Sequence, residues 1–405
     1  LGFLKPSCGP LAYTAAAADA GRAARRRIAE ILKEEGVDPD AAEEPRFAFV
    51  DALKALDAVR PSRPSHAAPF TFRMISSYFA DYGDPLVDDD VGSFPEGLLQ
   101  KLADEGVNAV WMHVVLNTLV KDARYPEFGA GSERRLANLK RLVARAQKYG
   151  IKVYLYLNEP RCLPAAFFEK DGRAAMRGAV EAKKGVAAMC TSVPEVRRWL
   201  KDSLAALFAE VKGLGGVFTI TMSENLTNCA SHSRRETCPR CKGRSVAEIL
   251  AEVNRTIAEG VATGDPAAET IVWNWAWPKG VEKDVLPKLP KRNCRVMHVS
   301  ENGIPVTVGG VTVPEHDYSI AIVGPGENAK SFWRTARANG LPVLAKVQAC
   351  NSWELSSFPF IPALDLVAEQ AAAVARLDGR LRDQLLRQVI IKITGFHVHS
   401  LFCNH

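Results

Sequence analysis

The sequence lacks a long hydrophobic run, a basic tract and a glycine-rich phosphate loop. None of its apolar stretches is long enough to cross a bilayer, so we expect no membrane-spanning helix. Its 52 Lys and Arg residues are interspersed with 46 acidic ones, and the net charge of +6 is modest for 405 residues, so no nucleic-acid partner is indicated. The segment "VGPGEN" at 323–328 lacks the lysine of a P-loop, and we expect a turn there.

Cysteines are few and scattered compared with a disulfide-stabilised protein. The nine cysteines lie mostly one by one in predicted strands or helices, which favours a reducing, cytoplasmic location. Six of them are expected to serve as small apolar side chains: Cys8, Cys162, Cys190, Cys294, Cys350 and Cys403. The chain begins with Leu1, which indicates a longer or processed precursor and leaves export open. The sequence gives no indication of the oligomeric state.

The composition divides the chain into two parts. Residues 15–36 are rich in Ala, Arg and Glu, which predicts an exposed helix, and the Pro- and Ser-rich residues 60–69 predict a linker. We therefore predict an N-terminal helical segment and linker over residues 1–68, which we interpret as the remnant of an α/β domain. Residues 69–405 would form the main domain, incomplete at its C-terminus because the last predicted strand has no helix after it.

Short β-branched and aromatic runs alternate with longer amphipathic stretches after the linker. The predicted strands begin at Phe72, Asn108, Lys152, Gly216, Thr270, Arg295, Pro342 and Ile391. The predicted helices are Pro95–Glu105, Glu133–Tyr149, Pro194–Leu214, Ser245–Ala262, Asn328–Asn339 and Leu364–Leu377, with a shorter one over Val281–Leu289. Eight near-continuous apolar strands alternating with helices predict an α/β fold, a (β/α)8 TIM barrel preceded by the short N-terminal segment.

Chemistry in such barrels is located at the C-terminal ends of the strands. Carboxylates at the predicted strand ends are Glu159, Glu224, Glu301 and Glu354. Aromatic residues accompany them, among them Tyr78, Trp275 and Trp353. Carboxylates can act as general acid, base or nucleophile, and flat rings stack on the apolar faces of sugars, so the pattern favours a carbohydrate substrate.

Two segments resemble barrel glycoside hydrolases. The stretch from Met189 to Glu224, ending in "GVFTITMSE", is similar to the β-N-acetylhexosaminidase-like group, in which such a stretch leads to the acid at the end of strand four. "CNSWE" at 350–354 resembles the superfamily of retaining barrel hydrolases that carry glutamates on strands four and seven. The resemblance covers the chain from Phe72 to about Gly395 and implies a retaining, exo-acting β-glycosidase on N-acetylhexosamine-containing or related glycans.

We accordingly predict that Glu224 is the general acid/base and Glu354 the nucleophile. Burial beside Met222 would raise the pKa of Glu224 and keep it protonated. The residues predicted to bind substrate are Trp353, Asn225, Glu301, Glu159, His113, Tyr78 and Trp275. Ser223 stands where the hexosaminidase pattern has Asp and where the strand-four/seven pattern has Asn, which puts substrate-assisted chemistry in doubt.

Three alternatives stay open. One is a substrate-assisted β-N-acetylhexosaminidase with Glu224 as the acid, and another is a carbohydrate-binding barrel that has lost catalysis. The third is a metal-dependent hydrolase that uses His113, His298, His316 and Asp317, although their spacing matches no known metal motif. The sequence leaves the sugar, the linkage and the stereochemical outcome open.

A cysteine-rich segment follows the predicted acid. Cys229, His232, Cys238 and Cys241 form the pattern C-x2-H-x5-C-x2-C, which indicates a tetrahedral zinc site. A redox pair of Cys238 and Cys241, a disulfide or free thiols are the other interpretations. Four protein ligands would leave no position for a catalytic water, so we expect a structural zinc that orders the loop beside Glu224.

Overall fold

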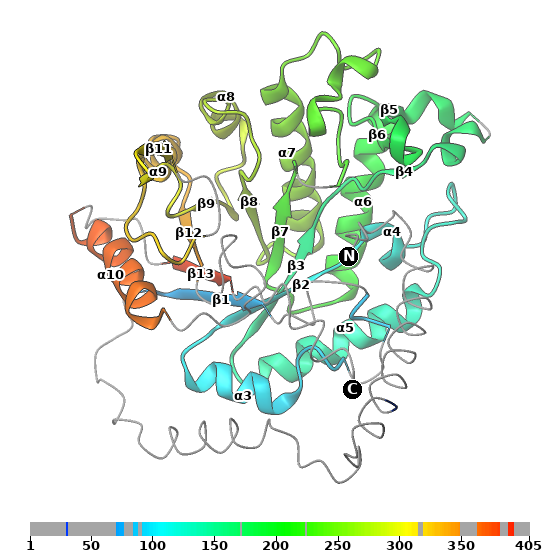
Figure 1. The fold of residues 1–405 in the computed structure, drawn as a ribbon. Coiled ribbons are helices and arrows are strands. Elements are labelled where there is room, and N and C mark those ends of the chain that lie inside the picture. The colour runs from blue at the N-terminus through cyan, green and yellow to red at the C-terminus, as the bar shows by residue number, and fades with distance from the viewer. Residues whose placement is uncertain are drawn as a thin grey trace. The chain divides into compact units, whose positions relative to one another are not determined.

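A parallel β-sheet that curls into a barrel organises the described part of the chain (Figure 1). The computed structural model describes residue 30 and residues 70–76, 84–87, 91–170, 172–222, 225–314, 319–348, 363–380 and 388–392. The strands of the sheet are β1 (Phe72–Ser76), β2 (Ala109–His113), β3 (Lys152–Leu157), β7 (Gly216–Ile220), β8 (Glu269–Trp273), β9 (Cys294–Val299), β12 (Val343–Gln348) and β13 (Gln388–Lys392).

The order of the strands follows the chain around the sheet. β2, β3, β7, β8, β9 and β12 each pair in parallel with the next, and β13 pairs with both β12 and β1. β7 and β12 are therefore the fourth and seventh strands of this arrangement. The first seven predicted strands correspond to strands of the sheet, and β13 overlaps the start of the eighth, which was predicted from Ile391. This confirms the α/β class and is consistent with a TIM-like barrel. A complete set of eight strand–helix units stays a prediction, because residues 393–405 lie outside the described ranges.

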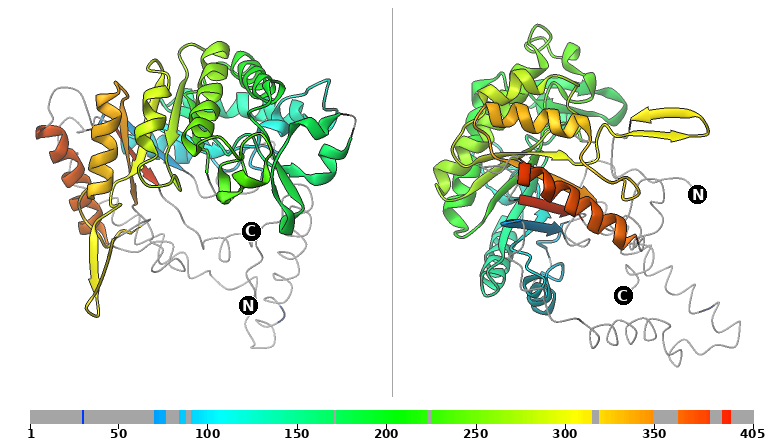
Figure 2. Two further views of the ribbon diagram at one scale, coloured as in Figure 1. Left: turned by 90° about the horizontal axis from the view of Figure 1, so that it is seen from above. Right: turned by 90° about the vertical axis from the view of Figure 1, so that its left-hand side faces the viewer.

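Helices cover the outer face of the sheet (Figure 2). They are α3 (Glu96–Asp104), α4 (Leu116–Leu119), α5 (Ser132–Gln147), α6 (Pro194–Glu210), α7 (Val246–Gly264), α8 (Glu282–Val285), α9 (Glu327–Ala338) and α10 (Leu364–Arg380). Each predicted helix corresponds to one of these, and α4 was not predicted. Within the described ranges, no helix combines the length and the apolar character that crossing a membrane requires.

Local sequence signals explain where these helices begin and end. Pro194 occupies the first turn of α6, where its missing N–H is not needed. At α7 the Ser245 side chain accepts from the backbone of Glu248, whose carboxylate accepts from the Ser245 N–H in return, which forms a capping box. After α5 and α9, Gly150 and Gly340 adopt a φ of 70°, a left-handed conformation that ends a helix and turns the chain toward the next strand.

The interior of the barrel is filled by large side chains from alternate positions of the strands. Trp111, Tyr154, Phe218 and Trp273 belong to one buried cluster, and the Phe218 ring stacks on Trp273 with a centroid separation of 5.5 Å. Because side chains on a strand alternate between two faces, residues two positions further along each strand also face the interior. This alternation decides which polar side chains lie at the C-terminal mouth.

Two small antiparallel sheets interrupt the alternation of strands and helices, and neither was predicted. β4 (Leu163–Pro164), β5 (Arg177–Glu181) and β6 (Val186–Met189) form a three-stranded sheet between β3 and α6. β10 (Pro305–Val308) and β11 (Val311–Pro314) form a hairpin after β9 that projects away from the barrel (Figure 2). Their short strands carry no long apolar period, so the sequence pattern alone does not reveal them.

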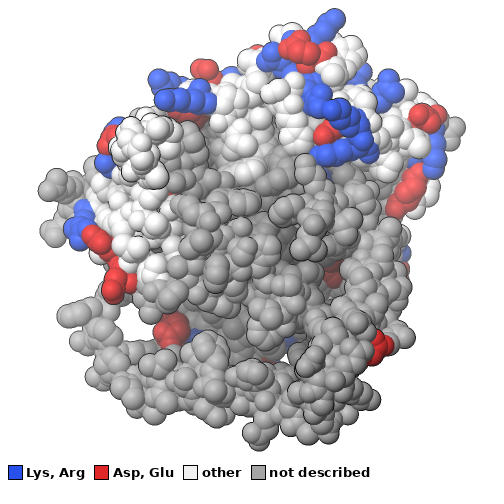
Figure 3. Space-filling model, viewed as in Figure 1, with Lys and Arg blue, Asp and Glu red and all other residues white. Residues whose placement is uncertain are grey.

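Charged side chains of both signs are interspersed on the described part of the surface. In Figure 3, Lys and Arg gather along the upper edge of the face shown, next to Asp and Glu. Several of these charges pair across neighbouring helices, as Lys201 of α6 does with Glu259 of α7 at 3.5 Å. The predicted domain of residues 1–68 lies outside the described ranges apart from Glu30, and its boundary stays a prediction.

Candidate functional site

Polar side chains form a layer at the C-terminal ends of several strands, above the aromatic interior. On β12, Lys346 and Gln348 lie two and four positions beyond the interior residue Leu344 and so on the same face of the strand. Both are buried, with Lys346 1% exposed. The Lys346 ammonium donates to the Gln348 side-chain oxygen at 2.7 Å. The interior of the barrel therefore changes from apolar to charged toward its mouth. A lysine within an apolar run is easily read as an exposed residue, and sequence reasoning missed this one.

Glu301 lies next to this lysine, two positions beyond the interior residue Val299 of β9. Its side chain is 1% exposed, and the Ser300 hydroxyl donates to its Oε2 at 2.9 Å. Burial raises the pKa of Glu301, and the nearby positive charge of Lys346 opposes that shift. Within the described residues Oε1 has no hydrogen-bond partner. This predicted substrate-binding residue is therefore buried at the polar layer, and its contact with a substrate stays a prediction.

Glu159 follows β3 and is almost fully buried, and its carboxylate accepts hydrogen bonds from backbone N–H groups of the same chain. Oε1 accepts from the Leu116 N–H at 2.8 Å and Oε2 accepts from the Arg161 N–H at 2.7 Å. Burial raises its pKa to about 6, although both hydrogen bonds favour the ionised form. Glu159 thus fastens the end of β3 to the start of α4. Its predicted contact with a sugar hydroxyl stays a prediction.

Asparagine and aromatic side chains line the mouth between β2 and β7. The Asn158 side chain donates to the Tyr156 hydroxyl at 3.2 Å and accepts from Asn225 at 3.3 Å. The His113 ring, at the end of β2, lies 5.6 Å from the Tyr156 ring. Trp275 packs against the interior cluster from the end of β8. Asn225, His113 and Trp275, all predicted to bind substrate, are therefore placed around this mouth.

His298 lies away from the mouth, because it alternates with the interior residues of β9. Its ring stacks on Phe332 of α9 with centroids 5.0 Å apart, and its Nδ1 contacts the Asn274 oxygen at 2.6 Å. Burial lowers the pKa of His298 to about 3, so the ring is neutral at physiological pH. A packing role explains these contacts, and among the described residues neither His298 nor His113 belongs to a group able to hold a metal. His316 and Asp317 lie outside the described ranges.

Four further predicted residues lie outside the described ranges: Glu224, Glu354, Trp353 and Tyr78. The described residues define where their segments begin. β7, the fourth strand, ends at Ile220, and the next two residues are buried, with Thr221 accepting a hydrogen bond from the Trp277 indole at 3.2 Å. β12, the seventh strand, ends at Gln348. Glu224 and Glu354 therefore follow the two strands to which the prediction assigned them.

Four buried cysteines converge beside this barrel end. The sulfur atoms of Cys190, Cys229, Cys238 and Cys241 all lie within 4.8 Å of one another, and none of the four residues is exposed. Three of them belong to the predicted zinc set, but the fourth position belongs to Cys190 instead of His232. The His232 Nδ1 contacts the Glu181 carboxylate at 3.1 Å, and His232 is not among the grouped residues.

Cys190 was expected to be a small core side chain. It follows β6 directly, and nothing in its local sequence resembles a zinc motif. Only the inserted sheet brings it to the other three cysteines. Cys162 and Cys294 are buried and lie outside this group, as the prediction of apolar packing required.

Comparison with known proteins gives matches only among solved structures. No protein-family profile matches the sequence, and no curated protein is similar to it. Among solved structures, the chain is similar to the virulence factor SghA in complex with its substrate analogue salicin, with 13% identity and a TM-score of 0.43 over 84% of this chain and 88% of that one.

Two further solved structures are similar to the chain. One is a GH20 exo-β-N-acetylglucosaminidase from Vibrio harveyi, with 11% identity and a TM-score of 0.46 over 80% of this chain and 50% of that one. The other is a family 89 glycoside hydrolase from Clostridium perfringens, with 13% identity and a TM-score of 0.45 over 81% of this chain and 36% of that one. The chain thus spans half or less of the length of these two proteins.

Proposed function

We propose that this chain is a glycoside hydrolase whose active site is the C-terminal mouth of the barrel. The observation that carries the proposal is the polar layer of His113, Asn158, Glu301, Lys346 and Gln348 above an aromatic interior. In TIM-like barrels, the catalytic groups are polar side chains at this end of the barrel. Hydrogen-bonding groups of both kinds, beside the half-buried Trp275, suit the hydroxyls and the apolar faces of a sugar.

Glu224 and Glu354 would carry the reaction. In the retaining version, Glu224 protonates the leaving-group oxygen while Glu354 attacks the anomeric carbon, and Glu224 then activates the water that releases the sugar. Their segments follow β7 and β12, which are separated around the barrel by β8 and β9. Carboxyl groups about 5–5.5 Å apart would support this retaining route, and a separation of about 6.5–9.5 Å would favour inversion through a water.

The described residues suggest how the substrate would be held. The Glu301 carboxyl group and the amide of Asn225 would bind hydroxyl groups, and Trp275 would stack on a pyranose face. The segment before Glu224 resembles the hexosaminidase-like group, so we propose N-acetylhexosamine-containing glycans as the substrate class. Substrate-assisted catalysis with Glu224 as the acid is the second candidate, although Ser223 stands where the hexosaminidase pattern has the Asp that this route uses.

The test is a comparison of Glu224→Gln and Glu354→Gln with the parent protein on a panel of fluorogenic β-glycosides. Each variant should lose activity by roughly 100- to 10,000-fold, because proton transfer or the covalent step is removed. The anomer first formed, followed by proton NMR, distinguishes retention from inversion. Loss in Glu224→Gln with full activity in Glu354→Gln would favour the substrate-assisted route.

A matched control separates chemistry from folding. Glu327→Gln removes a carboxylate at the exposed start of α9 and should leave turnover unchanged. Circular dichroism and thermal unfolding should be the same for all three variants and the parent. Full activity in both site variants would refute the assigned roles. Sugar binding by calorimetry without turnover of any glycoside would instead identify a carbohydrate-binding barrel.

A further inference from the structure

The four-cysteine cluster joins two segments that are far apart in the sequence. Cys190 comes from the end of the inserted β4–β6–β5 sheet, whereas the other three come from the segment between β7 and α7. Cys238 and Cys241 lie on a tight turn in which the Cys241 N–H donates to the Cys238 carbonyl at 3.1 Å. Such a turn presents two sulfur atoms in the same direction, as paired metal ligands require.

The spacing of the sulfur atoms matches a single tetrahedral metal ion. Cys190 Sγ lies 3.7 Å from Cys238 Sγ and 3.6 Å from Cys241 Sγ. Four thiolates at about 2.3 Å from a zinc ion stand about 3.8 Å apart along the edges of the tetrahedron. A disulfide requires about 2.05 Å between sulfur atoms, so these pairs are not disulfides. An iron–sulfur cluster distributes its four thiolates over two or more iron atoms, so the four sulfur atoms as a set need a wider spacing.

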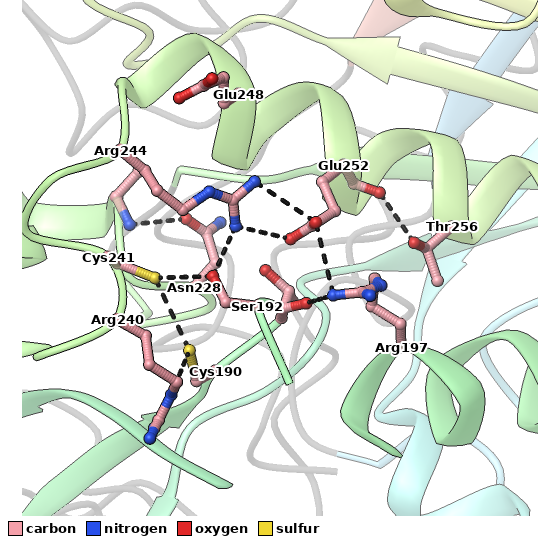
Figure 4. A network of polar contacts seen from close by, with 12 residues as sticks. Cys190, Ser192, Arg197, Asn228, Arg240, Cys241, Arg244, Glu248, Glu252 and Thr256 are labelled. Atoms are coloured by element: carbon pink, nitrogen blue, oxygen red, sulfur yellow. Dashed lines mark hydrogen bonds and ion pairs between the residues drawn. The ribbon is translucent and has the colours of Figure 1, made fainter. Parts of the chain in front are cut away.

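Donors around the sulfur atoms suit a negatively charged metal–thiolate centre (Figure 4). The Arg240 Nε donates to Cys190 Sγ at 3.4 Å, and the Ala179 N–H donates to Cys229 Sγ at 3.3 Å. The Ser192 hydroxyl lies 3.2 Å from Cys241 Sγ and accepts from Arg244. Four thiolates and one Zn²⁺ carry a net charge of −2, which these donors partly neutralise while they orient the ligands.

We propose that Cys190, Cys229, Cys238 and Cys241 bind one structural zinc ion. Four protein ligands close the coordination sphere, so the ion has no position for a substrate or a catalytic water. The zinc joins the inserted sheet to the segment that follows β7, and so holds in place the chain next to Glu224. The assignment of the metal site depends only on the cysteine geometry and is independent of the glycosidase proposal.

Gly178 packs closely against Cys229, one of the four cysteines. A Cβ at this position would lie 2.6 Å from Cys229 Sγ and 2.9 Å from the Ala188 carbonyl oxygen. Both distances are too short, so an alanine here must displace the sulfur or the strand. Gly178→Ala therefore perturbs the ligand geometry without removing a ligand.

The first experiment measures the metal content of the full-length protein, purified under reducing conditions, by inductively coupled plasma mass spectrometry. We expect about one zinc ion per chain. Replacement of the metal with Co²⁺ should give the absorption bands of a tetrahedral cobalt with four thiolate ligands. A spectrum of three thiolates and one imidazole would overturn the assignment of Cys190, and this readout requires no variant.

Matched variants then identify the ligands. Cys190→Ser should reduce the bound zinc several-fold, and Gly178→Ala should accelerate zinc release to a chromogenic chelator. His232→Ala and Cys294→Ser should keep the full zinc content, because His232 contacts Glu181 and Cys294 lies elsewhere in the core. A zinc-free, folded protein, iron in place of zinc, or loss of zinc in His232→Ala but not in Cys190→Ser would each refute the proposal.

Discussion

Replacing Glu159 with glutamine tests whether this buried carboxyl fastens the end of β3. In the native structure both its oxygens accept backbone N–H groups, and burial raises its pKa to about 6 from an ordinary 4.5. Glutamine has a single side-chain oxygen, so one of the two N–H groups loses its partner. That loss should lower the free energy of unfolding by about 1–3 kcal/mol at every pH.

The ionisation of Glu159 adds a term that does depend on pH. A pKa raised by about 1.5 corresponds to about 2 kcal/mol, at 1.36 kcal/mol for each unit. The raised value means that the carboxyl supports folding most strongly below pH 4.5, and that this support is lost as the pH rises through 6. The advantage of the parent over Glu159→Gln in unfolding free energy should therefore be about 2 kcal/mol larger at pH 4 than at pH 8.

Urea unfolding followed by tryptophan fluorescence at pH 4, 5, 6, 7 and 8 measures this difference. Glu169→Gln is the control, because this carboxylate is exposed on the three-residue-per-turn helix Ala165–Glu169. The control should shift the unfolding midpoint little at any pH. A constant difference between parent and Glu159→Gln over the whole range would refute the reasoning, since it would show that Glu159 does not titrate with a raised pKa.

Two further predictions concern single side chains. Lys346→Met removes the nearby cation that opposes the burial-raised pKa of Glu301, so the unfolding free energy should fall more at pH 8, where the carboxyl is more ionised, than at pH 5, while the exposed Lys283→Met should change it little. Urea titration checks this, and an unchanged midpoint would show that Lys346 does not stabilise Glu301. Ser245→Ala removes the capping box of α7 and should cost about 1 kcal/mol, whereas Ser245→Asn should preserve most of it; equal losses would contradict the capping role.

The strands that precede the two proposed catalytic glutamates could be predicted from local sequence patterns. The apolar runs starting at Gly216 and Pro342 are long and β-branched enough to predict buried strands, and they are the fourth and seventh strands of the sheet. Glu224 follows the last residue of β7, Ile220, in the next few positions of the chain, and Glu354 likewise follows Gln348, the last residue of β12. The paired spacing of Cys238 and Cys241 is likewise a local signal, because one tight turn presents both sulfur atoms.

The sequence by itself determined the α/β class, the approximate positions of the barrel strands and the longer helices, and three of the four cysteines, because each depends on residues close together in the chain. Only the tertiary structure decided that Cys190 completes the cluster, since an inserted sheet brings it there from a distant segment. It also decided that His232 binds Glu181, and that Lys346 faces the barrel interior while His298 packs under α9. These contacts and orientations depend on which elements pack together, and the local periodicity of the sequence does not determine that packing.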